Sequence, residues 1–161
     1  MPYGRRMEPS RVGRFVYLAQ WWFAVLLPCF FFWGRAMFGS TVGWLTVVGS
    51  VFIIPLIVIA LIPPLVTRAD RRGRAARSTS RGYAISSIVG WVGGVVAGLG
   101  IRDGGDTGGS GSAFTFSGMN AYASSVIALV GVVLAGLGWI ASIIWATADA
   151  AGSRGFAAEP A

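Results

Sequence analysis

Residues 51–62 read Val-Phe-Ile-Ile-Pro-Leu-Ile-Val-Ile-Ala-Leu-Ile and form the centre of an apolar run that extends over 42–66. Further apolar runs cover 15–33, 83–101 and 121–147, and none of the four runs contains Asp, Glu, Lys, Arg or His. At a rise of about 1.5 Å per helical residue, each run is long enough to cross a hydrocarbon core about 30 Å thick. The runs therefore predict an all-α fold, an integral membrane four-helix bundle.

The composition of the chain agrees with this interpretation. The 161 residues are 55% hydrophobic and 12% charged, and the apolar residues are gathered in blocks. This arrangement excludes the core of an ordinary water-soluble domain. All thirteen basic residues are Arg, and they flank the apolar runs. Membrane topology explains such basic segments more simply than nucleic-acid binding does, so we expect no nucleic-acid partner. The richness in Arg, Gly, Ala and Val suggests a bacterial source.

The distribution of Arg among the segments outside the runs predicts the orientation. Segment 1–14 holds four Arg and segment 67–82 holds six, which makes ten of the thirteen. The first connection offers only Arg35, and the third offers Arg102 against Asp103 and Asp106. Because positively charged loops stay in the cytoplasm, we expect both termini on the cytoplasmic side of a bacterial inner (plasma) membrane.

The domain organisation follows from these assignments. We expect a basic cytoplasmic N-terminal segment at 1–14, a single transmembrane domain at 15–147 and a flexible cytoplasmic tail at 148–161. The external loop 102–120 is rich in Gly and Ser, which is typical of a flexible linker.

The cytoplasmic loop 67–82 is a candidate site for anionic lipids. Each Arg near a membrane surface contributes about 1 kcal/mol of attraction to anionic headgroups. The candidate contact residues of this loop are Arg68, Arg71, Arg72, Arg74, Arg77 and Arg81.

Small residues recur in the third and fourth runs at alternating steps of three and four. This period of about 3.5 keeps one stripe of a helix against a partner and lets two backbones approach closely. Gly90, Gly94 and Gly98 also form a tandem Gly-x-x-x-Gly, which suits a crossing of opposite hand. The stripes predict a helix-packing interface, either between the third and fourth runs of one chain or between chains. The candidate residues are Ser86, Gly90, Gly93, Gly94, Ala97, Gly98, Ser124, Ala128, Gly131, Ala135, Gly138 and Ser142.

Candidate chemistry is scarce. The chain has no His and a single cysteine, Cys29, so we expect no bound metal and no cofactor. No nucleophile–base pair, carboxylate pair or phosphate-binding loop appears, which argues against an enzyme. Pro28 and Pro55 lie inside apolar runs, where we expect them to bend helices.

Two functions from different classes remain. The first is a structural or accessory subunit that packs through its small residues, as a homo-oligomer or within a larger membrane complex. The second is a pore-forming or transport oligomer, holin-like or channel-like, whose polar path would use hydroxyls and carbonyls. The absence of charged residues within the runs favours the first, because coupled transporters usually carry ionisable groups at membrane depth.

Overall fold

The computed structural model describes residues 10–70, 77–104 and 110–155, and within these ranges the chain is mainly helical. The elements in chain order are α1 (Arg11–Phe32), η1 (Gly34–Phe38), α2 (Trp44–Gly49), η2 (Ser50–Phe52), α3 (Ile53–Ala60), α4 (Ile62–Thr67), α6 (Arg81–Gly100), β1 (Asp103–Gly104), β2 (Ser110–Gly111), α7 (Ala113–Phe116) and α8 (Ala121–Gly155). The two strands pair antiparallel, with Asp103 opposite Gly111. The predicted all-α class is confirmed.

Among the described residues, four helical segments are long and apolar enough to cross a membrane, as the sequence predicts. They are Arg11–Phe32, Trp44–Thr67, Arg81–Gly100 and Ala121–Gly152. The second is divided into α2, η2, α3 and α4, and Pro63 and Pro64 occupy the first turn of α4. Proline lacks an N–H and clashes with the preceding turn, so the helix changes course at these positions.

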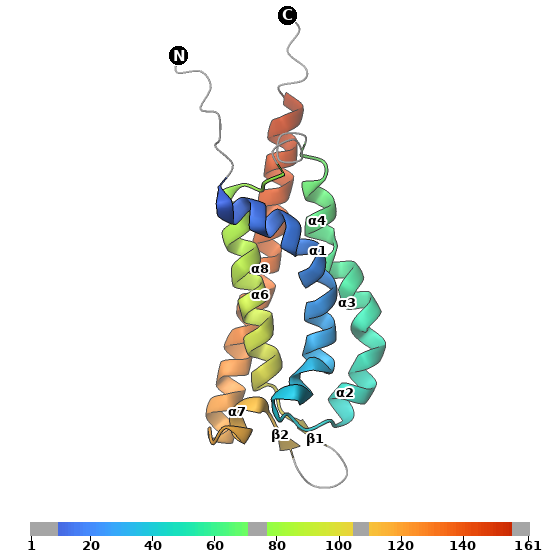
Figure 1. Ribbon diagram of the computed structural model, residues 1–161, viewed down its shortest axis with the longest axis vertical. Helices are drawn as coiled ribbons and strands as arrows, with labels where there is room; N and C mark the ends of the chain where they lie inside the picture. The colour runs from blue at the N-terminus through green and yellow to red at the C-terminus, as the bar shows by residue number, and fades with distance from the viewer. Residues whose placement is uncertain (1–9, 71–76, 105–109, 156–161) are drawn as a thin grey trace, which may run out of the picture.

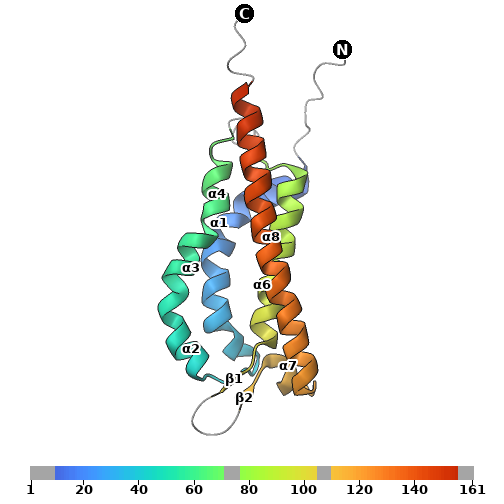
Figure 2. The same cartoon turned by 180° about the vertical axis from the view of Figure 1, so that it is seen from behind.

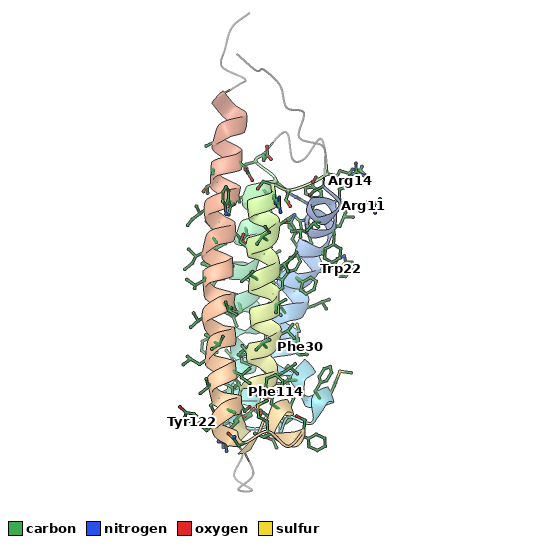
Figure 3. The ribbon with its side chains drawn as sticks, turned by 90° about the vertical axis from the view of Figure 1, so that its left-hand side faces the viewer. Arg11, Arg14, Trp22, Phe30, Phe114 and Tyr122 are labelled. Atoms are coloured by element: carbon green, nitrogen blue, oxygen red, sulfur yellow. The ribbon has the colours of Figure 1, made fainter. Side chains whose placement is uncertain are left out.

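The helices form an elongated bundle (Figure 1). Helices α6 and α8 lie side by side along their length, and α1 packs against α6. The run from α2 to α4 lies beyond α1, and α4 contacts α8. The first turns of α1, which carry Arg11 and Arg14, lie across one end of the bundle, as Figure 3 shows.

The two ends of the bundle collect different parts of the chain. The start of α1, the end of α4, the start of α6 and the end of α8 lie at one end, and η1, the two strands and α7 lie at the other (Figures 1 and 2). The segments flanking the basic loop 67–82 are therefore near the first described residues and the last ones. We call the end with the start of α1 and the end of α8 the basic end, and the end with the two strands and α7 the strand end.

Polar caps determine where the helices begin. The Ser10 side chain accepts a hydrogen bond from the Gly13 backbone N–H, and Ser80 does the same for Tyr83. Asn120 accepts from the Ala123 N–H at 2.7 Å, at the start of α8. Such caps satisfy N–H groups that have no partner within a first helical turn. Because of them α1 begins before the apolar run at 15, and α6 begins at Arg81.

The interior and exterior of the bundle differ in side-chain size. The described buried positions are mainly Gly, Ala, Ser and Thr, whereas large aliphatic side chains point outward. Val51 is 75% exposed and Ile54 is 73% exposed, and no residue of α3 is buried. A water-soluble domain buries such residues, so this surface is suited to an apolar surrounding.

Two expectations differ from the structure. The tail was expected to begin at 148, but α8 continues to Gly155 because Ala148, Ala150 and Ala151 favour helix. The stretch 103–112 of the external loop was expected to be a flexible linker, yet its two ends pair as strands, and α7 follows directly. In α7, Ser112 and Thr115 form a capping box, which orders this short helix.

Candidate functional site

The interface between α6 and α8 is built from most of the small residues singled out in the sequence. A Cβ added to Gly93 would lie 2.5 Å from the Ala135 backbone nitrogen, and one added to Gly131 would lie 2.5 Å from that of Ala97. Gly138 would meet the backbone of Gly90. The two backbones thus touch along an antiparallel seam within one chain, which we call the α6–α8 seam.

The second face of α6 packs against α1. A Cβ on Gly94 would lie 2.7 Å from the Leu27 side chain, and one on Gly98 would lie 3.1 Å from the Phe30 ring. The tandem Gly-x-x-x-Gly is therefore divided between two partners, with Gly90 facing α8 and the other two glycines facing α1.

Hydroxyl groups reinforce both ends of the α6–α8 seam. Ser142 of α8 lies 3.1 Å from the Ser86 hydroxyl and 3.2 Å from that of Ser87. At the strand end, Ser124 donates to the Gly100 carbonyl at 2.9 Å. Ala128, also on the predicted stripe, packs against Gly100. Buried hydroxyls in an apolar surrounding need such partners, and here they find them in the same chain.

An ion pair that the sequence reasoning missed lies at the strand end. Arg35 of η1 donates through Nη2 to the Asp103 carboxylate at 2.6 Å, and both side chains are 1% exposed. Arg35 also donates to the Ile101 carbonyl and to the Thr46 hydroxyl. This clasp joins η1 and α2 to β1, which is far from both in the sequence. The signal available in the sequence was the lone Arg of the first connection and the two Asp of the third connection, two connections that lie at the same end of the bundle.

Asp103 also caps α2. Its carboxylate accepts hydrogen bonds from the backbone N–H groups of Gly43, Leu45 and Thr46, at 2.9–3.0 Å. A carboxylate at a helix N-terminus is favoured by the free N–H groups and by the helix dipole. A Cβ at Gly43 would clash with the Gly104 carbonyl, so only glycine allows this close approach.

The clasp changes the pKa of both partners. Burial on its own would raise the pKa of Asp103, but the hydrogen bonds from Thr46, Leu45 and Gly43 outweigh it, and the pKa lies below its usual range. Burial lowers the pKa of Arg35, while Asp103 opposes that shift. The guanidinium of arginine is not deprotonated in proteins, so the pair is ionic.

The basic end contains three of the six candidate lipid-contact residues within the described ranges. Arg68 places its guanidinium 4.5 Å from the centre of the Trp21 ring, a cation–π contact between α1 and the end of α4. Arg77 and Arg81 are exposed. Arg71, Arg72 and Arg74 lie outside the described residues.

A cavity of about 360 Å³ lies between α1, α3, α4, α6 and α8. Its walls are aliphatic and aromatic, and they include a stacked pair of rings, Phe23 and Trp91, with centroids 4.2 Å apart. Near the start of α6, the polar side chains of Gln20, Tyr83 and Ser87 line the same cavity. The Tyr83 hydroxyl donates to the Gln20 amide oxygen at 2.7 Å.

Three of the described prolines line this cavity, and one of them, Pro63, explains a hydrogen bond between α3 and α8. Pro63 has no N–H to donate to the Ile59 carbonyl one turn earlier. The indole N–H of Trp139 on α8 donates to that carbonyl instead, at 3.2 Å. This bond joins α3 to α8 across the side of the cavity. Pro28 and Pro64 also line the cavity.

The described part of the chain brings no three His, Cys, Asp or Glu side chains together as a metal site. The comparisons with known proteins add no family. No protein-family model, no curated protein and no solved structure matches the chain.

Proposed function

We propose that this chain is a multi-pass membrane protein that crosses the bilayer four times. The supporting observation is the reversed distribution of side chains, with Gly, Ala and Ser inside and large aliphatic residues outside. In lipid, helices gain little from burying apolar surface, so they associate through close backbone packing and interhelical hydrogen bonds. The α6–α8 seam has both features.

The proposed orientation places both termini and the loop 67–82 in the cytoplasm of a bacterial cell, with the strand end outside the inner membrane. Ten of the thirteen Arg belong to segments 1–14 and 67–82 of the sequence. Moving one positive charge across the membrane against the resting potential costs about 2.3 kcal/mol per 100 mV. Arg68, Arg77 and Arg81 would then lie near anionic headgroups, and the Arg68–Trp21 pair would lie in the interfacial layer.

Within the membrane, we propose a structural or accessory role rather than transport. The observation that carries this choice is that the interior hydroxyls bond to one another and to backbone carbonyls of the same chain. The α6–α8 seam then holds the chain's own helices together. A larger membrane complex or a second copy would contact the outward-facing aliphatic residues of α3 and α8.

Extraction in a mild detergent tests this role. We expect the protein to migrate with a mass above that of one 16.9 kDa chain in its detergent micelle, accompanied by itself or by another membrane protein. Isolation as a lone monomer in several mild detergents would contradict an accessory role and would leave the membrane location intact.

The pore-forming alternative has less support, because the serines that would line a path are paired across the α6–α8 seam. Purified protein reconstituted in liposomes should therefore pass ions and small solutes no faster than empty vesicles do. A flux well above that control would favour the pore.

A further inference from the structure

The cavity between α1, α3, α4, α6 and α8 has the features of a binding site for a lipid. We propose that it binds one uncharged lipid chain that carries a hydroxyl-bearing head, with the head next to Gln20, Tyr83 and Ser87. This inference rests on the proposed membrane location and adds a ligand to it.

The walls of the cavity specify the body of the ligand. Its volume of about 360 Å³ falls within the range of small-molecule sites, and its lining is overwhelmingly apolar. Leu27, Phe31 and Ile59 face it from α1 and α3, and Trp91 and Trp139 add flat aromatic walls. Protein interiors are close-packed, so a space of this size in contact with lipid is best filled by a hydrocarbon chain.

The lining also specifies the charge of the ligand. Every polar side chain that lines the cavity is neutral: Gln20, Tyr83, Ser87 and Ser142. A phosphate or an ammonium group would have to be buried there without an opposite charge, which is strongly unfavourable. The site therefore favours an uncharged lipid over a phospholipid headgroup.

The hydrogen bonds at the polar corner match a hydroxyl group. An amide nitrogen carries two N–H groups, and Gln20 directs one of them to the Tyr17 carbonyl at 3.0 Å. The Gln20 oxygen accepts from Tyr83, and the Ser87 hydroxyl lies 3.2 Å from that of Ser142. The remaining Gln20 N–H and the lone pairs of Ser87 offer one donor and one acceptor. A hydroxyl can use both, because it accepts and donates.

The side of the cavity explains how a lipid reaches it. Gly136 lies on the cavity wall, is exposed, and has nothing within 4 Å of the position that a Cβ would take. Val132, one turn earlier on α8, also lines the cavity and is 46% exposed. The cavity therefore opens sideways between α3 and α8, where the Trp139–Ile59 hydrogen bond spans the opening.

Native mass spectrometry of the delipidated, detergent-solubilised protein tests the proposal. The probes are monooleoylglycerol, which is uncharged and carries hydroxyls, and oleoyl lysophosphatidylglycerol, which has the same chain and an anionic head. We expect one saturable monooleoylglycerol per chain, with an affinity about tenfold or more above that of the anionic lipid.

Gly136→Phe places a ring in the cavity opening, and Gly152→Phe is its matched control. Gly152 lies on the same helix, is exposed, and also has nothing within 4 Å of a built Cβ, but it does not line the cavity. Both changes replace glycine with a better helix former, so neither is expected to unfold α8. Gly136→Phe should weaken binding about tenfold or more, and Gly152→Phe should leave it unchanged.

The polar corner has its own test. Ser87→Ala should reduce the preference for monooleoylglycerol over methyl oleate, which has the same chain and no hydroxyl.

Each opposite outcome overturns a defined part of the account. Equal binding by the two phenylalanine variants, or no bound lipid at all, would contradict the cavity site. A preference for the anionic lipid would contradict the neutral head. Recovery of the wild-type protein from the aqueous fraction without detergent would instead contradict the membrane location on which the inference rests.

Discussion

Asp103 receives hydrogen bonds from several parts of the chain at once. Its carboxylate oxygens accept from Arg35 Nη2, from the backbone N–H groups of Gly43, Leu45 and Thr46, and from the Thr46 hydroxyl. A buried carboxylate is stable only when its lone pairs are used in this way. The clasp therefore fixes the position of α2 relative to η1 and β1.

Removing one partner of this clasp should be costly. Asp103→Ala leaves the Arg35 guanidinium buried without its counter-charge, and we expect the free energy of unfolding to fall by about 3–5 kcal/mol. The double variant Arg35→Met, Asp103→Leu should recover only part of this loss, because it removes both buried charges but leaves the N–H groups that Asp103 caps without their acceptor. Unfolding in mixed detergent micelles, followed by circular dichroism, measures the difference. A loss no greater than that of an exposed substitution such as Arg81→Ala would contradict a structural clasp.

The lowered pKa of Asp103 gives the clasp a pH dependence. Because the carboxyl pKa is lower in the folded state than in the unfolded state, its contribution is fully present above the unfolded value of about 4. The contribution is lost as the pH falls from there through the folded pKa. The unfolding free energy of the wild type should therefore decrease over this acid range more steeply than that of Asp103→Asn. Parallel pH profiles for the two proteins would argue against the assignment.

The clasp also illustrates what sequence reasoning cannot reach. Asp103 stands at the edge of a Gly-rich stretch, and composition alone assigns such a stretch to a linker. Its partner Arg35 lies 68 residues earlier. Only the antiparallel course of the helices brings the two loops to the same end.

At the scale of the helices, the α6–α8 seam depends on the absence of side chains at a few positions. Backbone atoms of the opposite helix occupy the space where a Cβ of Gly93, Gly131 or Gly138 would lie. Close approach of this kind supplies dispersion contacts and weak Cα–H···O bonds, which lipid cannot replace.

Two glycines of α8 provide a matched comparison. Gly131→Ala puts a methyl group 2.5 Å from the Ala97 nitrogen and should destabilise the protein by about 1–3 kcal/mol through overpacking. Gly136→Ala meets nothing within 4 Å and should be neutral or stabilising by up to about 1 kcal/mol, since alanine favours helix. Unfolding in mixed micelles separates the two. Equal effects would show that the seam is not closely packed.

The hydrogen bond between Trp139 and Ile59 makes a prediction about coupling. Trp139→Phe should cost about 0.6 kcal/mol, the average for an interhelical hydrogen bond in a membrane protein. In a Pro63→Ala background the helix supplies its own N–H to the Ile59 carbonyl, so the same change should cost less. A double-mutant cycle measures the difference between the two costs. Additive effects would contradict the idea that the Trp139 indole N–H replaces the backbone N–H that Pro63 lacks.

The period of the small residues predicts that α6 and α8 each have a close-packed face. It leaves open which helix each face meets, because spacing carries no information on partners. The structure places Gly93 and Gly131 within one chain and assigns Gly94 and Gly98 to α1. The division of Trp44–Thr67 into shorter helices agrees with the positions of its prolines, since Pro55 leaves the Val51 carbonyl without a helical N–H and Val51 lies in η2.

At the scale of the whole molecule, the apolar runs predict the number of long helices and their approximate bounds. Polar caps and the alanine-rich end of α8 shift the observed ends by a few residues, as expected where propensity and capping compete with hydropathy. The cavity could not be predicted from the sequence, because residues from five helices form it. No pattern among neighbouring residues in the sequence indicates that these five helices meet around one cavity.

The central claim is that this chain crosses a membrane with its basic end in the cytoplasm, and single-cysteine labelling tests it directly. In a Cys29→Ala background, Met37→Cys places a thiol at a position that is 87% exposed at the strand end, and Ala69→Cys places one at an exposed position at the basic end. Neither change alters the charge that sets the orientation.

A membrane-impermeant maleimide should label the Met37→Cys variant in intact bacterial cells and the Ala69→Cys variant only after the cells are permeabilised. Labelling of the Ala69→Cys variant in intact cells, with the Met37→Cys variant protected, would contradict the account.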